Sequence, residues 1–162
     1  MTTAYSLLIK NFLHQLGAGD SEVNDALGLE FEHDDLLVKI CAHPNKQELL
    51  LDVAILKLDD DTPATLNAQR YHTLLQLNAL ARYSHGATAA LTADNILTLG
   101  RTLPLASMDA PALLTHFNRL IELALELRQC WQNLGELLER ASNPGATQTQ
   151  AAVAAVPFGN FA

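Results

Sequence analysis

The stretch PATLNAQRYHTLLQLNALARYSHGATAALTADNILTLGRTLPLASMD, residues 63–109, contains the signals that decide the fold. Its apolar residues first recur with helical spacing, and Gly86 then follows as a typical residue just past a helix end. Pro63 suits the first helical position, because an N–H at that position would have no helical partner. Residues 87–93 and 96–103 then alternate with period two around an Asp-Asn pair. The stretch therefore predicts one helix followed by a strand hairpin.

The apolar residues of this predicted helix cover about 220° of the helical wheel, whereas a helix docked on one face needs about 100°. The wide arc favours a second packing partner. We interpret the second face as a self-association surface, with enclosure of the helix inside its own domain as the alternative. The predicted dimer interface comprises Tyr71, Leu74, Leu75, Asn78, Ala89 and Leu91.

An amphipathic helix is predicted upstream over residues 3–16, with one apolar stripe that includes Leu8 and Phe12. Period-two alternation then predicts strands over 29–33, 36–43 and 48–58. The short turns between them imply antiparallel pairing, because a parallel crossover needs about a dozen residues. The third strand is apolar on both sides, so it is either sandwiched or awaits a partner. One side carries Leu49, Leu51, Val53 and Ile55; the other carries Leu50, Asp52, Ala54, Leu56 and Leu58.

The last predicted helix begins near Asp109, a suitable N-cap, and runs to about residue 141. A 4-3 spacing of apolar residues runs along it, which is the coiled-coil period. We expect this seam to pack on the sheet, and a free coiled coil is the alternative. The seam comprises Leu113, Phe117, Leu120, Ala124, Leu127, Trp131, Leu134 and Leu138. Residues 1–141 are thus expected to form one domain, and the Ala, Gly, Pro and Gln-rich residues 142–162 a flexible tail.

Composition limits the possible partners of this chain. The 162 residues are 49% hydrophobic and carry a formal net charge of −8, with a sequence pI near 5.0. Nucleic acids and anionic membranes favour basic surfaces, so neither is expected as a partner. No apolar run approaches a membrane span of about 20 residues. The N-terminal residues lack the layout of a signal peptide, and Cys41 and Cys130 fit buried thiols, so we expect a cytoplasmic protein.

The sequence lacks a recognisable catalytic, metal or cofactor motif. No two of the six histidines are four residues apart, and none has ligand spacing to a cysteine. Cys41 and His43 fall on one strand face, but nothing marks an orienting group for a catalytic pair. The run from Asp59 to Asp61 lacks the alternation and glycine of a calcium loop. We therefore predict a protein that is not an enzyme and needs no cofactor.

The predicted order is helix, three strands, helix, two strands and helix. This is an α+β fold with a twisted antiparallel sheet of about five strands flanked by three helices. Four stretches in this order resemble the landmarks of the class I type III secretion chaperones, the CesT or Tir chaperone family. They are LLIKNFLHQLG, QELLLDVAILKL, TLLQLNALARYSHGATAAL, and NILTLGRTLPLASMDAPALLTHFNRLIELALELRQCW.

The resemblance implies a homodimer in the bacterial cytoplasm. Such a dimer binds the N-terminal segment of a secreted effector and keeps it competent for export without ATP, and the secretion ATPase is a candidate partner. Two other functions remain open. One is a dimeric interaction module of the same fold that acts as a regulator or assembly adaptor, and the other is a small enzyme or ligand-binding domain.

An effector client is expected to bind along apolar surface on the first helix and the adjacent sheet face. Partly exposed leucines on a soluble acidic protein require a cover, and an extended client can supply it while pairing with a strand edge. The alternative is that the chain itself buries these side chains. The predicted client-binding residues are Ile9, Leu13, Leu16, Leu37, Leu50, Ala54 and Leu56.

Overall fold

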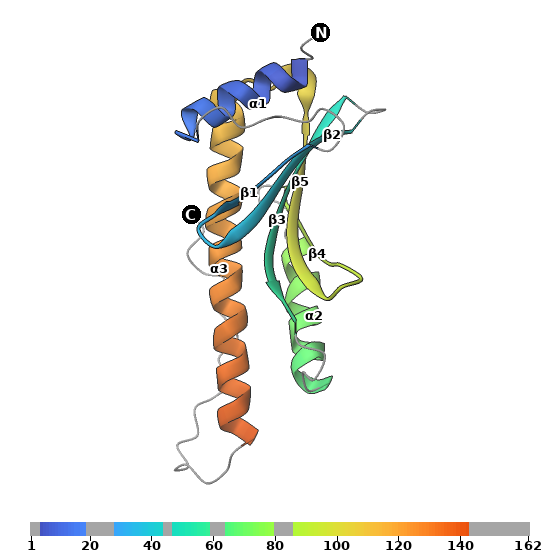
Figure 1. The fold of residues 1–162 in the computed structure, drawn as a ribbon. Coiled ribbons are helices and arrows are strands. Elements are labelled where there is room, and N and C mark those ends of the chain that lie inside the picture. The colour runs from blue at the N-terminus through green and yellow to red at the C-terminus, as the bar shows by residue number, and fades with distance from the viewer. Residues whose placement is uncertain (1–3, 19–27, 44–46, 59–63, 80–85, 143–162) are drawn as a thin grey trace.

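The computed structural model describes residues 4–18, 28–43, 47–58, 64–79 and 86–142, and for 64, 65 and 134–142 it describes the backbone alone. The predicted order of elements is confirmed (Figure 1). The helices are α1 (Ala4–Gln15), α2 (Ala64–Ala79) and α3 (Ala110–Ser142), with a short 3-10 turn η1 (Leu105–Ser107) before α3. The strands are β1 (Leu29–His33), β2 (Leu36–His43), β3 (Glu48–Lys57), β4 (Thr88–Leu91) and β5 (Ile96–Pro104).

The five strands form one antiparallel sheet in the order β1-β2-β3-β5-β4. The second hairpin therefore joins the first three strands through β5, which leaves β1 and β4 at the two edges. Figure 1 shows α3 alongside the sheet, α1 across the N-terminal part of α3, and α2 near β4. The C-terminal part of α3 continues beyond the end of the sheet (Figure 1).

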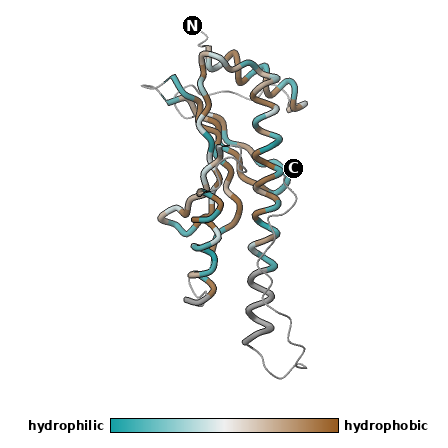
Figure 2. The backbone as a smooth tube through the Cα atoms, turned by 180° about the vertical axis from the view of Figure 1, so that it is seen from behind, coloured by the Kyte–Doolittle hydropathy of each residue, from teal (hydrophilic) through white to brown (hydrophobic). Residues whose placement is uncertain are grey.

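The core lies between α3, α1 and one face of the sheet. The buried strand residues alternate, as Val38 and Ile40 do on β2 and Leu49 and Leu51 do on β3. On α3 the predicted seam is buried as far as it is described: Leu113, Phe117, Leu120, Ala124, Leu127 and Trp131. Hydrophobic and hydrophilic positions alternate along this helix accordingly (Figure 2). Packing of the seam in the core is thus confirmed up to Trp131, and the side chains of residues 134 and 138 lie outside the described part.

Phe117 is where α3, α1 and β1 meet. Its ring contacts the rings of Phe12, Phe31 and His33, with centroid distances of 5.5, 6.0 and 5.0 Å. Aromatic pairs at such distances favour edge-on or tilted geometry. Phe12 lies on α1, and Phe31 and His33 lie on β1. One α3 side chain therefore fixes both the crossing helix and the edge strand.

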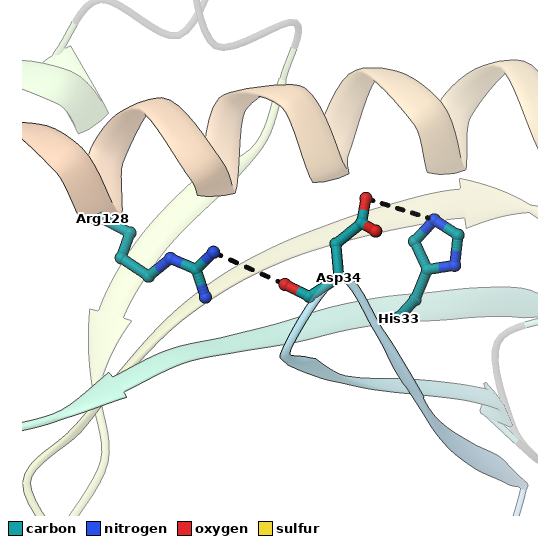
Figure 3. Close-up of polar contacts among 3 residues, drawn as sticks. All are labelled: His33, Asp34 and Arg128. Carbon is teal, nitrogen blue, oxygen red and sulfur yellow. Dashed lines mark hydrogen bonds and ion pairs between the residues drawn. The ribbon is translucent and has the colours of Figure 1, made fainter.

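Arg128 ties the β1–β2 turn to α3 (Figure 3). Its two terminal guanidinium nitrogens donate to the backbone oxygens of Asp35 and Asp34, at 3.3 and 3.4 Å. Both aspartates have positive φ, 51° and 58°, as the central residues of a two-residue type I′ hairpin do. The His33 Nε2 lies 3.7 Å from Asp34 Oδ2 on the same turn (Figure 3).

The alternation predicted for the third strand, β3, is wrong near the C-terminal end of the strand. A bulge between Ala54 and Leu56 shifts the register of β3, so that Leu56 pairs with the core residue Leu97. Leu56 consequently packs against the core, and Leu58 is buried. The extra residue reverses the alternation, and neither leucine shares the side of Leu50 and Ala54.

The predicted N-cap of α3 is confirmed, since Asp109 Oδ1 accepts a 2.8 Å hydrogen bond from the backbone N–H of Ala112. Gly86 has the positive φ of 80° expected of a glycine past a helix end, although the described part of α2 stops at Ala79. The predicted start of α2 at Pro63 and the C-terminal tail fall outside the described residues.

Candidate partner-binding surfaces

The sheet has a second face, directed away from α3, which we call the outward face. It carries Leu37 and Lys39 from β2, Leu50, Asp52 and Ala54 from β3, and Thr98 and Gly100 from β5. Leu37 is 48% exposed, whereas Leu50 and Ala54 are half-buried. Leu37 and Ala54 are in register on neighbouring strands, and Leu50 lies on the same face beyond Asp52. Uncovered apolar side chains on a sheet face are typical of a binding surface.

A polar row crosses the same face next to these apolar positions. In the strand register Lys39 of β2 is opposite Asp52 of β3, and Asp52 is opposite Gly100 of β5. A Cβ atom on Gly100 would collide with the Asp52 carboxylate, so only glycine lets the carboxylate lie over β5. Partial burial raises the pKa of Asp52, and the Lys39 charge offsets part of that rise. A half-buried carboxylate on an apolar face favours a cationic partner group.

The predicted client-binding residues do not form one surface. Ile9 and Leu13 are buried in the core, and Leu16 is half-buried against it, because the stripe of α1 packs on α3 and the sheet. Leu37, Leu50 and Ala54 share the outward face, on the opposite side of the sheet. Leu56 belongs with the core after the bulge. The accessible part of the predicted client-binding set is therefore the exposed Leu37 with the half-buried Leu50 and Ala54.

The predicted dimer residues do gather at α2 and β4, although not all of them are accessible. Leu74 and Ala89 are buried, and Leu91 packs against the core. Asn78 is occupied within the chain: its amide makes two hydrogen bonds with the backbone of Ala89. Tyr71 and Leu75, which are 45% and 69% exposed and four residues apart, form one apolar ridge on α2.

Two features were missed by the sequence reasoning. Leu7 of α1 is 57% exposed. The sequence could have indicated this, because Leu7 is an apolar residue that lies outside the apolar stripe of the helix. The amide of Asn78 supports β4, and its signal was a single polar residue within the apolar arc of α2. Each residue thus departs from the apolar and polar spacing of its own helix.

Within the described residues, no group of three or more histidine, cysteine, aspartate or glutamate side chains could hold a metal ion. Cys41 and Cys130 are both free thiols, half-buried, and His43 is exposed. Burial, with a smaller effect of the Glu126 charge, raises the pKa of the Cys130 thiol, which makes it a poor nucleophile. The described helices include none that is long and apolar enough to cross a membrane.

Fold and surfaces together define a small α+β binding domain. It exposes an apolar ridge on α2 and apolar side chains on the outward face of the sheet. A sequence model of the Tir chaperone protein (CesT) family matches residues 7–128. The match covers most of the chain, so this protein belongs to the CesT family of Tir chaperones. The resemblance stated from the sequence is thereby confirmed. No curated protein matches the chain.

Solved structures share the fold at low sequence identity. The chain is similar to one in the ExsC–ExsE complex (TM-score 0.66, 14% identity, 80% of this chain and 94% of that one). It is also similar to a chain in the HopA1–SchA chaperone–effector complex (0.63, 17%, 78% and 94%). A third is the Yersinia pestis type III secretion chaperone SycH in complex with a YscM2 fragment (0.60, 21%, 77% and 99%).

The same fold also occurs in a protein from Methanothermobacter thermautotrophicus described as uncharacterized (0.58, 15%, 81% and 98%). The fold by itself therefore does not assign a client, and function has to be argued from the family and from the surfaces of this chain.

Proposed function

We propose that this protein is an ATP-independent cytoplasmic chaperone that binds the N-terminal segment of a type III secreted effector and keeps it competent for export. The observation that carries the proposal is the match to the Tir chaperone family along residues 7–128. Similar chains in effector and secretion-chaperone complexes add support. Such a protein acts by binding and not by catalysis.

The outward face is the proposed client surface. Leu37, Leu50 and Ala54 offer apolar contacts to a client that lies extended across the strands. Asp52, between them, would pair with a lysine or arginine of the client, and the net charge of −8 would favour basic client segments generally. Apolar contacts would supply the affinity, and the position of the cation would fix the register of the client.

The client would add its own strand to the sheet at β1. The other edge strand, β4, already has Ala89 bonded to Asn78, whereas β1 pairs with β2 on one side only within the described residues. An extended peptide that pairs with a free edge satisfies its backbone while its alternate side chains reach one face of the sheet. Strand addition at β1 would place the client's outward side chains beside Glu30 and Glu32, and Glu32 is in register with Leu37 of β2.

The working unit is proposed to be a homodimer with Tyr71 and Leu75 at the two-fold axis. These side chains are the large apolar groups that α2 leaves exposed. Two-fold dimers are the commonest assembly, and their interfaces pair the same ridge from both subunits. Leu74, Asn78 and Ala89 would support this ridge from within each chain.

A dimeric interaction module that acts as a regulator or assembly adaptor is the second candidate. The same fold in the uncharacterized Methanothermobacter thermautotrophicus protein favours keeping it, since the fold alone does not fix the kind of partner. The two functions differ in the partner: a chaperone captures an exported protein by its N-terminal segment, and an adaptor captures a resident one.

The test is to purify the tagged protein from its native cells and identify stoichiometric partners by mass, before and after type III secretion is induced. Leu37→Asp and Leu50→Asp should reduce capture of the partner by tenfold or more without lowering the melting temperature. Leu7→Asp is the control for Leu37→Asp, because it places the same charge on another exposed leucine, on α1. A resident partner would exclude the chaperone function in favour of an adaptor, and capture unaffected by both strand variants would exclude the proposed client surface.

A further inference from the structure

Three basic side chains gather where α3 meets β5, and we call Arg101, His116 and Arg119 the basic cluster. Arg101 lies on β5 between the buried residues Leu99 and Leu103, so its side chain is on the α3 side of the sheet. His116 and Arg119 are three residues apart and therefore share one flank of α3. Arg101 and His116 are half-buried and Arg119 is exposed, so the cluster opens from the helix–sheet border to solvent.

The charges of the basic cluster act on one another. Burial lowers the pKa of His116, and the charges of Arg101 and then Arg119 lower it further. Burial likewise lowers the pKa of Arg101, with Arg119 as the next cause. The three groups are thus close enough to repel one another in a chain whose net charge is −8.

The described part of the chain provides no anionic partner for the basic cluster. None of the three side chains makes an ion pair or side-chain hydrogen bond with a described residue, and the buried Nδ1 of His116 has no hydrogen-bond partner there. Glu122 follows Arg119 by three residues without forming an ion pair with it, and Asp109 is engaged at the start of α3. Clustered cations without a carboxylate favour an anion from outside.

We propose that the basic cluster is a binding site for a carboxylate side chain of the client polypeptide. This inference rests on the proposed function, since it places one acidic client residue on the chaperone. Guanidinium groups match a carboxylate with paired hydrogen bonds, and His116 can add a further donor when it is protonated.

The charge of the remaining surface gives this site its selectivity. An acidic client residue is repelled by a protein with net charge −8 except where basic groups outnumber acidic ones. The outward face, with Asp52, selects a cation, and the basic cluster selects an anion on the other side of the sheet. Two sites of opposite charge, on the two faces of the sheet, would fix both the register and the direction of the client polypeptide that contacts them.

The test uses N-acetyl-glutamate N-methylamide as the probe, with its glutamine analogue as the matched neutral ligand. The ring protons of His116 are assigned from a His116→Gln variant and titrated by NMR at constant ionic strength. We expect saturable binding of the glutamate probe that raises the pKa of His116 by about one unit. The exposed histidines His43 and His72 should not respond.

Variants locate the bound probe. Arg119→Gln, at an exposed position, and Arg101→Gln should each weaken glutamate binding by about tenfold, as for a lost charge-assisted hydrogen bond. Lys57→Gln removes the same charge from an exposed position on β3 and should leave binding unchanged. Circular dichroism of each variant confirms folding, and Arg119→Gln keeps the test valid if Arg101→Gln does not fold.

Three results would overturn the proposal. One is equal response to the glutamate and glutamine probes, and another is tenfold tighter binding of inorganic phosphate, which would assign the site to a phosphate group. The third is a free protein in which His116 has an ordinary pKa and ignores the probe, because a carboxylate of the chain would then already occupy the cluster. None of these requires a client, so they are distinguishable from failure of effector capture.

Discussion

The side-chain amide of Asn78 bonds to both backbone groups of Ala89. Its Nδ2 donates to the Ala89 oxygen at 2.8 Å, and its Oδ1 accepts from the Ala89 N–H at 2.8 Å. Ala89 is opposite Leu99 of β5, and because its N–H and carbonyl both bond to Asn78, the two groups point away from β5, along the outer edge of β4. One helical side chain therefore takes the place of a neighbouring strand and protects an edge that could otherwise pair with another chain.

Asn78→Ala is expected to destabilise the protein by about 1–3 kcal/mol, because it leaves the two Ala89 groups without partners in a partly buried site. Urea unfolding monitored by circular dichroism measures the loss. The variant should also aggregate faster, since the edge of β4 becomes available. Gln76→Ala is the matched control on an exposed position of the same helix. Equal stability of the two variants would show that the amide does not support β4.

Leu120→Ala is expected to cost about 2–5 kcal/mol, as for a leucine removed from a packed core. Leu120 is buried in the α3 seam beneath the sheet, whereas the nearby Asn118 is exposed. Asn118→Ala should therefore change the unfolding free energy by less than about 0.5 kcal/mol. If an isolated peptide of residues 109–141 formed a stable helical oligomer, the seam would be able to act as a coiled coil without the sheet.

Arg128→Lys is expected to loosen the β1–β2 turn. A lysine keeps the charge but cannot donate to the carbonyls of Asp34 and Asp35 with a planar fork, and one such bond contributes about 0.5–1.5 kcal/mol. Amide exchange should speed up at the turn and in β1 while the core strands keep their protection. Arg119→Lys is the control on the same helix, and unchanged exchange at the turn would refute a role for the Arg128 bonds.

Asp52→Asn tests the half-buried carboxylate of the outward face through its pH dependence. Burial raises the pKa of Asp52 above its ordinary value of 3.8, so folding favours the protonated acid and the charged form destabilises the fold at neutral pH. The variant should therefore be more stable than the wild type at pH 7. The difference should shrink as the pH falls through the raised pKa and vanish below about 3.8. A difference that grows on acidification would mean that the Lys39 charge, and not burial, dominates at this site.

The sequence predicted the bounds of the helices and strands, but not which of their apolar faces the chain itself buries. The helix expected over residues 3–16 is Ala4–Gln15, and the strands expected over 29–33 and 36–43 have those bounds. Periodicity reports which face of an element is apolar. It does not tell whether the chain itself or a partner covers that face, which is why Ile9 and Leu13 were assigned to a client surface although α1 packs both into the core.

One further error and one missed contact have local causes that periodicity does not contain. The bulge after Ala54 adds one residue to β3, which moves Leu56 and Leu58 to the side opposite the one that strict alternation gives. Asn78 was assigned to a dimer interface because it lies in the apolar arc of α2, yet its amide bonds to a strand brought near only by the tertiary fold. Contacts between distant elements depend on tertiary packing, so the periodicity of a single sequence does not reveal them.

The proposed homodimer gives the last prediction. Tyr71 and Leu75 are exposed on one ridge of α2, and burial of this ridge against its symmetry mate would remove two large apolar side chains per chain from water. Tyr71→Glu with Leu75→Glu should convert the dimer into a folded monomer, because like charges would then meet across the two-fold axis. Light scattering at micromolar concentration measures the mass, and circular dichroism verifies the fold. Gln69→Glu with His72→Glu adds the same two charges at exposed polar positions of α2 and should leave the dimer intact. A monomeric mass for the unaltered protein would contradict self-association through α2, and a dimeric mass for the double variant would place the interface on another element.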